Sequence, residues 1–285
     1  MASENEQFAP SGMVSEYLGR LGHTGSTDVT LDTLQALVSA HTRSIAFENI
    51  DSLLGRPVVN LGMEALVDKL VRRGRGGFCY EQNGLMGYVL EELGFGVTHV
   101  GGRVVWPHDE GAPPSAENHD VLTVTIPGIK TRFVVDVGFG GATPTAPLQL
   151  VEDLVQLTPH GAFKLVSVDG GFLLQTQVRG EWRAVYTFTT QPRPRIDQEV
   201  GSWYMSTHPT SYFVTGLTAA IVTADERYNL RGCNLTVHGA HATKHRRLEG
   251  PEEILDQLSS RFRLDLKDCG DQDVLRARID EVLDA

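Results

Sequence analysis

Cys79 stands in a sequence setting that suits a nucleophile. It follows the glycine-rich stretch "RRGRGG", residues 72–77, and precedes an apolar stripe at helical spacing, so it is predicted in the first turn of a helix. The positive end of a helix dipole favours a thiolate over a thiol, and the free backbone N–H groups there can hold an oxyanion. The alternative interpretation is a small apolar residue at a junction between loop and helix.

His119 and Asp136 are the candidate partners of this cysteine. His119 is predicted to begin the strand "HDVLTVTI" and Asp136 to end the strand "TRFVVDV", and the link "PGIK" between them predicts a hairpin. With residues 127–130 as the loop, His119 lies opposite Gly138, and Asp136 is its diagonal neighbour on the same face. A loop of three or five residues would put the two side chains on opposite faces.

Together the three residues predict a catalytic triad. Asp136 lies among valines, where a carboxylate needs a partner such as an imidazole N–H, although it could instead cap the glycine turn that follows. A thiolate nucleophile needs an imidazole, and the imidazole needs an orienting acid. The order cysteine, histidine, aspartate is shared by papain-like and transglutaminase-like folds, and it leaves protease, amidase, transglutaminase and acyltransferase open.

The periodicity of apolar residues predicts an α+β protein whose helices come before its strands. Helical spacing recurs in residues 28–44, 61–73 and 80–93, with Asp28 or Thr30 as a cap of the first helix and Gly94 ending the third. Strand-like alternation then predicts a small barrel, from segments 98–106, 121–126, 131–139, 163–168, 171–178 and 181–188. Residues 191–197 are predicted to be a linker before a mixed end, with strands at 213–223 and 234–238 and helices at 251–262 and 273–283.

Composition narrows the class of protein. The chain has 285 residues, 41% of them hydrophobic, which is ample for a buried core. Its net charge of −11 disfavours a general nucleic-acid binder and gives no attraction to anionic lipid. Three cysteines are too few for a disulfide framework. Residues 1–12 are polar, which predicts a loose tail and not a signal peptide. No apolar run approaches the ~20 residues that span a bilayer. A cytoplasmic protein without membrane or nucleic-acid partners is the expectation.

Four motifs resemble those of one enzyme family. "IAFENID", "RGGFCYEQNGL", "DVGFGG" and "SWYMSTHPTSYF" occur in the order typical of the arylamine N-acetyltransferases, and the similarity runs from about residue 14 to the end, closest to the actinobacterial members. The resemblance implies a helical bundle at 1–96 carrying the nucleophile, a β-barrel at 97–205 carrying the histidine and aspartate, and an α/β lid at 206–285. It also implies acetyl transfer from acetyl-CoA to arylamines and arylhydrazines by a ping-pong route.

The resemblance also implies roles for single residues. Cys79 would be the acetyl acceptor, His119 the base and Asp136 the orienting acid, and Glu48 would pair with Arg75. Ala46, Tyr80 and Gln82 depart from the residues that are commoner in the family motifs. The aromatic-amine pocket is expected at Phe47, Tyr80 and Phe139, and the CoA cleft at Trp106, Gly138, Thr143, His208 and Phe213. Core packing is the alternative role for the aromatic residues among them.

Two further patterns are weaker evidence of function. His238, His241 and His245 have a spacing that could ligate a metal, but no cysteine or acid accompanies them, so no metal site is predicted. Arg72, Arg73 and Arg75 could form a nucleic-acid patch, but in an acidic chain a helix end and an internal ion pair explain them better. A cysteine hydrolase or transglutaminase-like enzyme remains the alternative function, and a non-catalytic binding module with this fold is the third.

Overall fold

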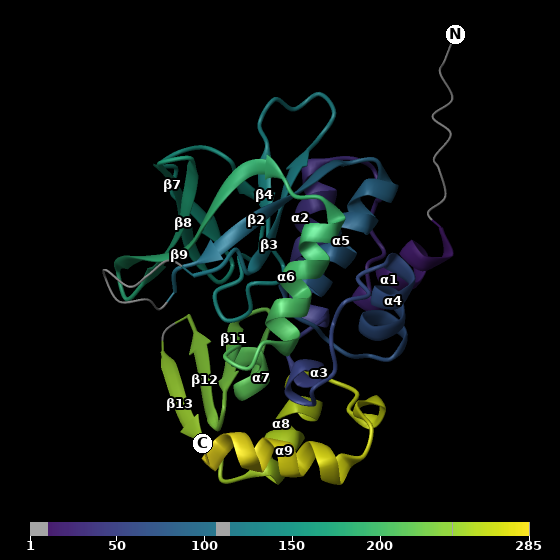
Figure 1. Cartoon of the computed structure of the whole chain (residues 1–285). Coiled ribbons are helices and arrows are strands. Elements are labelled where there is room, and N and C mark those ends of the chain that lie inside the picture. Colours follow the sequence, from purple (N-terminus) through teal and green to yellow (C-terminus); the bar gives the residue numbers. More distant parts are fainter. Residues whose placement is uncertain (1–10, 107–114, 241, 285) are drawn as a thin grey trace.

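The computed structural model describes residues 11–106, 115–240 and 242–284. Residues 1–10 of the predicted N-terminal tail lie outside these ranges, as do residues 107–114. Figure 1 shows three groups of elements along the chain: helices in the N-terminal part, a curved sheet in the middle, and a C-terminal group of strands and helices. The α+β class and its three-part order are those expected from the sequence.

The N-terminal part is helical and ends in the helix that carries Cys79. Its elements are α1 (Gly12–Leu21), α2 (Leu31–Ser44), α3 (Ile50–Leu53), α4 (Met63–Val67), the π-helical turn η1 (Asp68–Arg72) and α5 (Cys79–Leu93). Thr30 caps α2, because its hydroxyl accepts the N–H of Thr33, and Gly94 ends α5 in the left-handed region at φ 99°. Both boundaries were predicted from the sequence.

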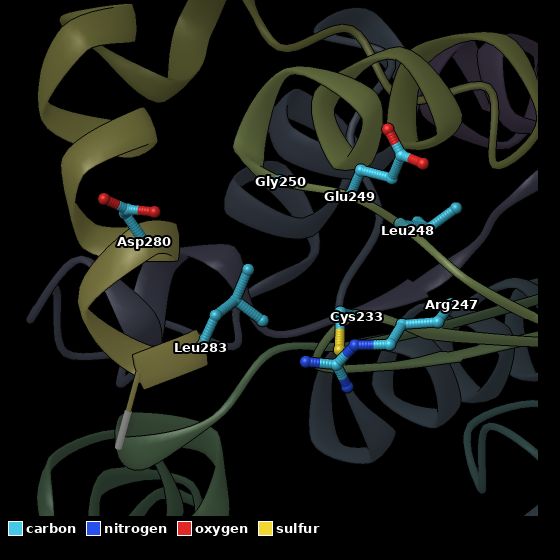
Figure 2. Close-up of a pocket in the computed structure, with 7 residues that line it drawn as sticks. All are labelled: Cys233, Arg247, Leu248, Glu249, Gly250, Asp280 and Leu283. Carbon is cyan, nitrogen blue, oxygen red and sulfur yellow. The ribbon is translucent and has the colours of Figure 1, made fainter.

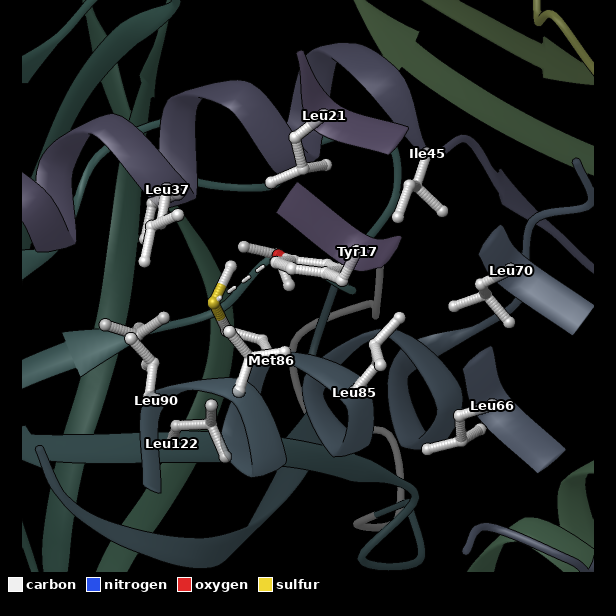
Figure 3. Close-up of a cluster of buried hydrophobic side chains, with 14 of the residues drawn as sticks. Tyr17, Leu21, Leu37, Ile45, Leu66, Leu70, Leu85, Met86, Leu90 and Leu122 are labelled. Atoms are coloured by element: carbon white, nitrogen blue, oxygen red, sulfur yellow. Dashed lines mark hydrogen bonds between the residues drawn. The ribbon is translucent and has the colours of Figure 1, made fainter. Parts of the chain in front are cut away.

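Large apolar side chains join these helices into one core. Figure 3 shows Tyr17 of α1 between leucines of the other helices, with Met86 of α5 against its hydroxyl. Leu122 of strand β3 (His119–Thr125) reaches the same cluster, so α5 packs directly on the strand that begins at His119. Burial of these side chains stabilises the fold and fixes α5 against the sheet.

The middle of the chain is an eight-stranded, nearly closed barrel. Its strands are β2 (Gly96–Val104), β3 (His119–Thr125), β4 (Phe133–Val135), β5 (Leu148–Gln149), β6 (Gln156–Thr158), β7 (Gly161–Val168), β8 (Gly171–Val178) and β9 (Glu181–Pro192). The order is β5-β4-β3-β2-β9-β8-β7-β6. The side chain of Gln156 joins the two end strands, because its amide oxygen accepts the backbone N–H of Gln149 at 2.6 Å and its amide nitrogen donates to the Gln149 carbonyl oxygen at 2.9 Å.

The β3–β4 hairpin has the register that the sequence predicts. Leu122 lies opposite Val135 and Val124 opposite Phe133, which continues to His119 opposite Gly138. Strand β4 is shorter than predicted, because the backbone of Val137 bonds to a side chain of α5 instead of continuing the ladder.

The C-terminal part contains helix α6 (Arg195–Thr207), α7 (Tyr212–Thr215), β10 (Thr218–Val222), β11 (Glu226–Arg231), β12 (Asn234–Gly239), β13 (Thr243–Arg247), α8 (Pro251–Ser260), the 3₁₀ turn η2 (Lys267–Cys269) and α9 (Gln272–Asp284). The predicted linker 191–197 is wrong, because β9 runs to Pro192 and α6 begins at Arg195. The predicted strand 213–223 begins as helix α7. Strands β11 and β13 were not predicted. Every residue of β13 is exposed, so its sequence shows no alternation of apolar and polar residues that would indicate a strand.

The helical and C-terminal parts share a sheet. Strand β1 (Phe47–Glu48) pairs with β10, giving the order β1-β10-β11-β12-β13. The predicted boundary at 205/206 falls inside α6, and the domain limits stay predictions. Within the three described ranges, no helix is both long and apolar enough to cross a membrane.

Candidate active site

Cys79 is the first residue of α5 and is 3% exposed. The approach to it requires glycine, because a Cβ on Gly76 would lie 2.1 Å from the carbonyl oxygen of Ala46. The backbone N–H of Phe78 donates to the carboxylate of Glu81 at 3.1 Å, which closes the first turn of the helix. The thiol is therefore held at a helix N-terminus, as the sequence predicted.

His119 and Asp136 form a buried pair. His119 Nε2 lies 2.7 Å from Asp136 Oδ2, with both residues at most 2% exposed. Burial alone would lower the pKa of His119, but the charge of Asp136, the hydrogen bond to Asp136 and the neighbouring Cys79 raise it to about 10. Burial would raise the pKa of Asp136, whereas the charge and hydrogen bond of His119 lower it. The arrangement favours an imidazolium between a carboxylate and a thiol.

The nucleophile helix and the hairpin touch at Gly138. A Cβ there would lie 2.7 Å from Cys79 Cα and 3.1 Å from Gln82 Cβ. The Cys79 sulfur lies 3.8 Å from the carbonyl oxygen of Asn118, directly before His119. Only glycine at position 138 allows the cysteine, the histidine and the aspartate to meet.

Asp136 has two further hydrogen-bond donors, and one of them was not predicted. Its Oδ1 accepts the N–H of Gly138 at 3.0 Å, which is the glycine-turn cap considered as an alternative, so Asp136 fills both roles. The same oxygen accepts the side-chain amide of Asn83 at 3.0 Å. Asn83 follows Cys79 by four residues and so shares its face of α5, a spacing that could have identified it.

Two aromatic groups border the triad. Phe213 of α7 contacts Phe47 and Phe78 at ring-centroid distances of 5.8 and 5.2 Å. Phe139 meets the edge of His119 at 5.3 Å, and Tyr186 of β9 packs on the same imidazole at 4.8 Å. Phe213, predicted in the CoA cleft, thus lies against Phe47, which was predicted in the amine pocket. Tyr186 was missed, because an aromatic residue in a barrel strand has no distinguishing sequence signal.

The other predicted binding residues are more dispersed. Tyr80 is buried, and its hydroxyl donates to the carbonyl oxygen of Glu117 at 3.4 Å. Trp106 is half-buried, and Thr143 is buried with its carbonyl accepting a bond from Arg227. His208 is half-buried and stacks on the ring of Tyr204 at 4.4 Å. Their roles in binding stay predictions.

The predicted ion pair below the cysteine is present. Arg75 is fully buried and donates to one oxygen of Glu48 at 3.0 and 2.7 Å. Burial would lower the pKa of Arg75, but Glu48 and Asp51 raise it. Lys69 extends the cluster, bonding to Asp51 and Glu81 at 2.6 Å each. The glycine-rich loop is thus anchored by paired charges, which a buried cation requires.

A network of hydrogen-bonded side chains also holds this loop, and it was not predicted. The amide nitrogen of Gln82 donates to the carbonyl oxygens of Ala46 and Gly77 at 2.7 and 3.2 Å, so its oxygen must be the acceptor for His41 Nε2 at 2.5 Å. His41 Nδ1 then accepts the hydroxyl of Tyr17 at 2.8 Å. Burial lowers the pKa of His41 to about 4, so this histidine is neutral.

Other features of the molecule lie outside this site. A surface cavity of about 400 Å³ is lined by Cys233, Arg247, Leu248, Glu249, Gly250, Asp280 and Leu283. Figure 2 shows Leu283 of α9 pointing toward Cys233 and Arg247, with Asp280 earlier on the same helix. Within residues 11–106, 115–240 and 242–284, no group of three or more His, Cys, Asp or Glu side chains could hold a metal, and His241 of the histidine-rich stretch lies outside these ranges.

A cysteine at a helix N-terminus, next to a buried histidine–aspartate pair on strands, is the arrangement of cysteine-dependent acyl-transfer enzymes. A sequence model of the N-acetyltransferase family matches residues 30–270. An arylamine N-acetyltransferase of Mycolicibacterium smegmatis is 56% identical over 268 residues, covering 94% of this chain and 97% of the relative. The chain belongs to the arylamine N-acetyltransferase family and is an acyltransferase.

Solved structures agree with this membership. The arylamine N-acetyltransferase of Mycobacterium marinum is 52% identical and superposes with a TM-score of 0.94, over 95% of this chain and 99% of that one. A structure of the M. marinum enzyme in complex with CoA, also 52% identical, superposes at 0.93 over 94% of this chain and 99% of that one. The fold and the family expected from the sequence are thereby confirmed.

Proposed function

We propose that this protein transfers the acetyl group of acetyl-CoA to arylamines and arylhydrazines through an acetyl-Cys79 intermediate. The observation that carries the proposal is the buried pair of His119 and Asp136 at 2.7 Å beside the thiol at the start of α5. The CoA complex of the M. marinum relative supports CoA as the leaving group. The aromatic side chains that pack on His119 and on Phe78, the residue before Cys79, support a flat amine as the acceptor.

The first half-reaction forms the thioester. The Cys79 thiolate attacks the acetyl carbonyl, the bond from carbonyl carbon to the sulfur of CoA breaks, and the His119 imidazolium gives its proton to the departing thiolate. Asp136 keeps the imidazole in the tautomer and orientation for that transfer. The backbone N–H groups in the first turn of α5 that make no hydrogen bond within the helix are the candidate donors to the oxyanion that forms.

The second half-reaction forms the amide. The nitrogen of the arylamine attacks the acetyl-Cys79 carbonyl, His119 takes the proton that the nitrogen loses, and the Cys79 thiolate leaves. The imidazolium and thiolate are then restored, so the cycle balances without any further reactant. Water in place of the amine would give acetate, which is the reaction of the alternative cysteine hydrolase.

The test is mass spectrometry combined with CoA release. Incubation with acetyl-CoA alone should add one acetyl group to the peptide that contains Cys79, and later addition of an arylamine should remove it and yield the N-acetyl product. CoA release should depend on the amine across a panel of arylamines and hydrazines. Acetate as the main product at saturating amine would favour the hydrolase, and an unmodified Cys79 would overturn the mechanism.

A further inference from the structure

Asn83 connects the helix of the nucleophile to both strands of the hairpin. It is fully buried and lies one turn after Cys79 on α5. Its amide nitrogen donates to the carbonyl oxygen of Asp120 at 2.6 Å and to Asp136 Oδ1 at 3.0 Å. Its amide oxygen accepts the backbone N–H of Val137 at 2.9 Å. Three partners, one on β3 and two directly after β4, therefore hold one side chain of the helix.

The orientation of this amide is unambiguous. A backbone N–H can only donate and a backbone carbonyl can only accept, so the oxygen of Asn83 must face Val137 and the nitrogen must face Asp120. The second N–H of the amide then points at the carboxylate of Asp136. Both donors of Asn83 are used, and one of them supports the charged form of the acid.

The other groups near Asp136 do not replace this contact. His119 of β3 bonds to the opposite carboxylate oxygen, Oδ2. Tyr186 of β9 packs on His119 and also lies close to Asp136, and burial, the charge of Asp136 and the contact with its carboxylate all raise the pKa of this phenol. Tyr186 belongs to the barrel, so it cannot link Asp136 to α5. Asn83 and the N–H of Gly138 are thus the donors to Oδ1, and only Asn83 links that oxygen to α5.

We propose that Asn83 is a positioning residue that orients Asp136 toward His119 and sets the distance between helix α5 and the hairpin. It touches no reacting atom, and it acts through the carboxylate and through Val137. This proposal rests on the proposed function, since it assigns Asn83 to the site of acetyl transfer. It differs from a purely structural role because one of its three partners is the acid of the triad.

The chain supplies a matched control in Asn49. That residue is also buried, donates to the carbonyl oxygens of Phe213 and Gly216 at 2.8 and 2.7 Å, and accepts the N–H of Thr218 at 2.8 Å. It therefore makes the same number and kind of hydrogen bonds, but none to a charged group. Asn49→Ala measures the effect of removing a buried amide and its three hydrogen bonds. Asn83→Ala measures the same effect together with the loss of the hydrogen bond to Asp136.

The experiment follows iodoacetamide alkylation of Cys79 between pH 5 and 9, together with single-turnover acetylation by acetyl-CoA. In Asn83→Ala, alkylation at pH 6 should fall about 10-fold, because one hydrogen bond to a charged group is lost. Formation of acetyl-Cys79 should slow by up to about 100-fold, because the acid and the helix lose their alignment. Asn49→Ala should lower the urea midpoint similarly but keep the wild-type pH profile of alkylation.

The outcomes separate this proposal from the proposed function. A wild-type pH profile and single-turnover rate in folded Asn83→Ala would overturn the role of Asn83 while leaving acetyl transfer intact. Failure of wild-type Cys79 to accept an acetyl group would overturn the function, yet the alkylation profile would still test Asn83. If Asn83→Ala does not fold, Asn83→Asp keeps the shape and the acceptor for Val137 and should also lower alkylation at pH 6, because two adjacent carboxylates cannot both ionise. An unchanged profile in that variant would overturn the proposal equally.

Discussion

At the scale of single residues, the three cysteines differ in what surrounds them. All three lie within the described residues as buried free thiols. Only Cys79 lies at a helix N-terminus beside an imidazole. Burial raises the pKa of the Cys269 thiol to about 11, with Arg75 opposing this, so Cys269 is protonated at neutral pH. Burial by itself therefore does not make a cysteine reactive, whereas its electrostatic partners do.

The first prediction follows from this contrast. Cys79→Ala should abolish formation of the acetyl-enzyme and reduce amine acetylation by at least about 10³-fold, because no other group can form the thioester. Cys233→Ala and Cys269→Ala should retain acetylation within a few-fold. CoA release, measured with each purified variant, checks this. Near-normal turnover by Cys79→Ala would mean that acetyl transfer does not pass through this thiol.

The second prediction concerns the pH dependence that His119 confers. In His119→Gln, alkylation of Cys79 at pH 6 should fall at least about 10-fold, because the thiolate loses its imidazolium partner. The pKa of His119 is about 10 in the fold, above its unfolded value of about 6.5, so its pairing stabilises the protein fully below pH 6.5. That stabilisation is lost as the pH rises through about 10.

Urea unfolding at several pH values measures the same effect on stability. The wild-type protein should lose unfolding free energy between about pH 6.5 and 10, and His119→Gln should lose less over that range. A variant of a histidine outside the site, His23→Gln, serves as the control. If the unfolding free energy changes equally with pH in His119→Gln and in the wild-type protein, the pair of His119 with Asp136 contributes nothing to stability.

At the scale of elements, the site depends on how closely α5 approaches the turn after β4. The third prediction is that Gly138→Ala lowers activity by about 10- to 100-fold and unfolding stability by about 1–3 kcal/mol. The added Cβ would lie 2.7 Å from Cys79 Cα, a backbone atom of the helix, so α5 must move away from the hairpin. Steady-state kinetics and urea unfolding measure the two effects.

Gly19 provides the control for this substitution. It lies in α1, has a right-handed helical backbone, and has no atom within 4 Å of its added Cβ. Gly19→Ala should therefore stabilise the protein by up to about 1 kcal/mol through helix propensity and leave acetylation unchanged. Wild-type activity in Gly138→Ala would contradict the close contact between helix and hairpin.

At the scale of the whole molecule, the C-terminal part is integrated with the helices. Strand β10 pairs with β1, and Ile50 and Leu53 of α3 share a buried cluster with the C-terminal residues. Deleting residues 206–285 would expose that apolar cluster to solvent. A substitution that leaves the fold in place is therefore the sharper test of whether the C-terminal part covers the active site.

The fourth prediction therefore concerns Arg278 of α9. Its guanidinium donates to the carbonyl oxygens of Leu53 at 3.0 Å and Val214 at 2.8 Å, and so ties α9 to α3 and to the short helix that carries Phe213. Arg278→Ala should raise the KM for arylamine about 10-fold, because the short helix that carries Phe213 loses its bond to α9. It should also increase hydrolysis of acetyl-Cys79 relative to transfer, because water gains access.

The control lies two residues away on the same helix. Arg276 pairs with Glu252 and Asp273 at the surface, where ion pairs contribute little. Arg276→Ala should match the wild-type KM and the wild-type ratio of acetate to N-acetyl product. If Arg278→Ala also matches them, the C-terminal helix does not act on the site through α7.

Local signals in the sequence determined the elements and several of their ends. The helical period, the cap at Thr30, the stop at Gly94 and the glycine-rich entry to Cys79 each depend on neighbouring residues, and the structure has them. The register of β3 and β4 was also predictable, because a loop of known length and a side-chain period of two leave one face for His119 and Asp136. The linker at 191–197 was wrong, because prolines there sit at a strand end and before a helix instead of in a free loop.

Contacts between residues far apart in the chain were decided by the tertiary structure. Three such contacts are the pairing of β1 with β10, the hydrogen bond of Asn83 to Asp136, and the hydrogen bonds that connect Gln82 through His41 to Tyr17. Each joins segments whose local sequence patterns do not predict the contact. Polar residues on α5 have no preferred partner until the helix is buried, after which each N–H and carbonyl must be satisfied. The sequence thus determined which side chains could perform the chemistry, and packing of α5 on the barrel decided which of them support it.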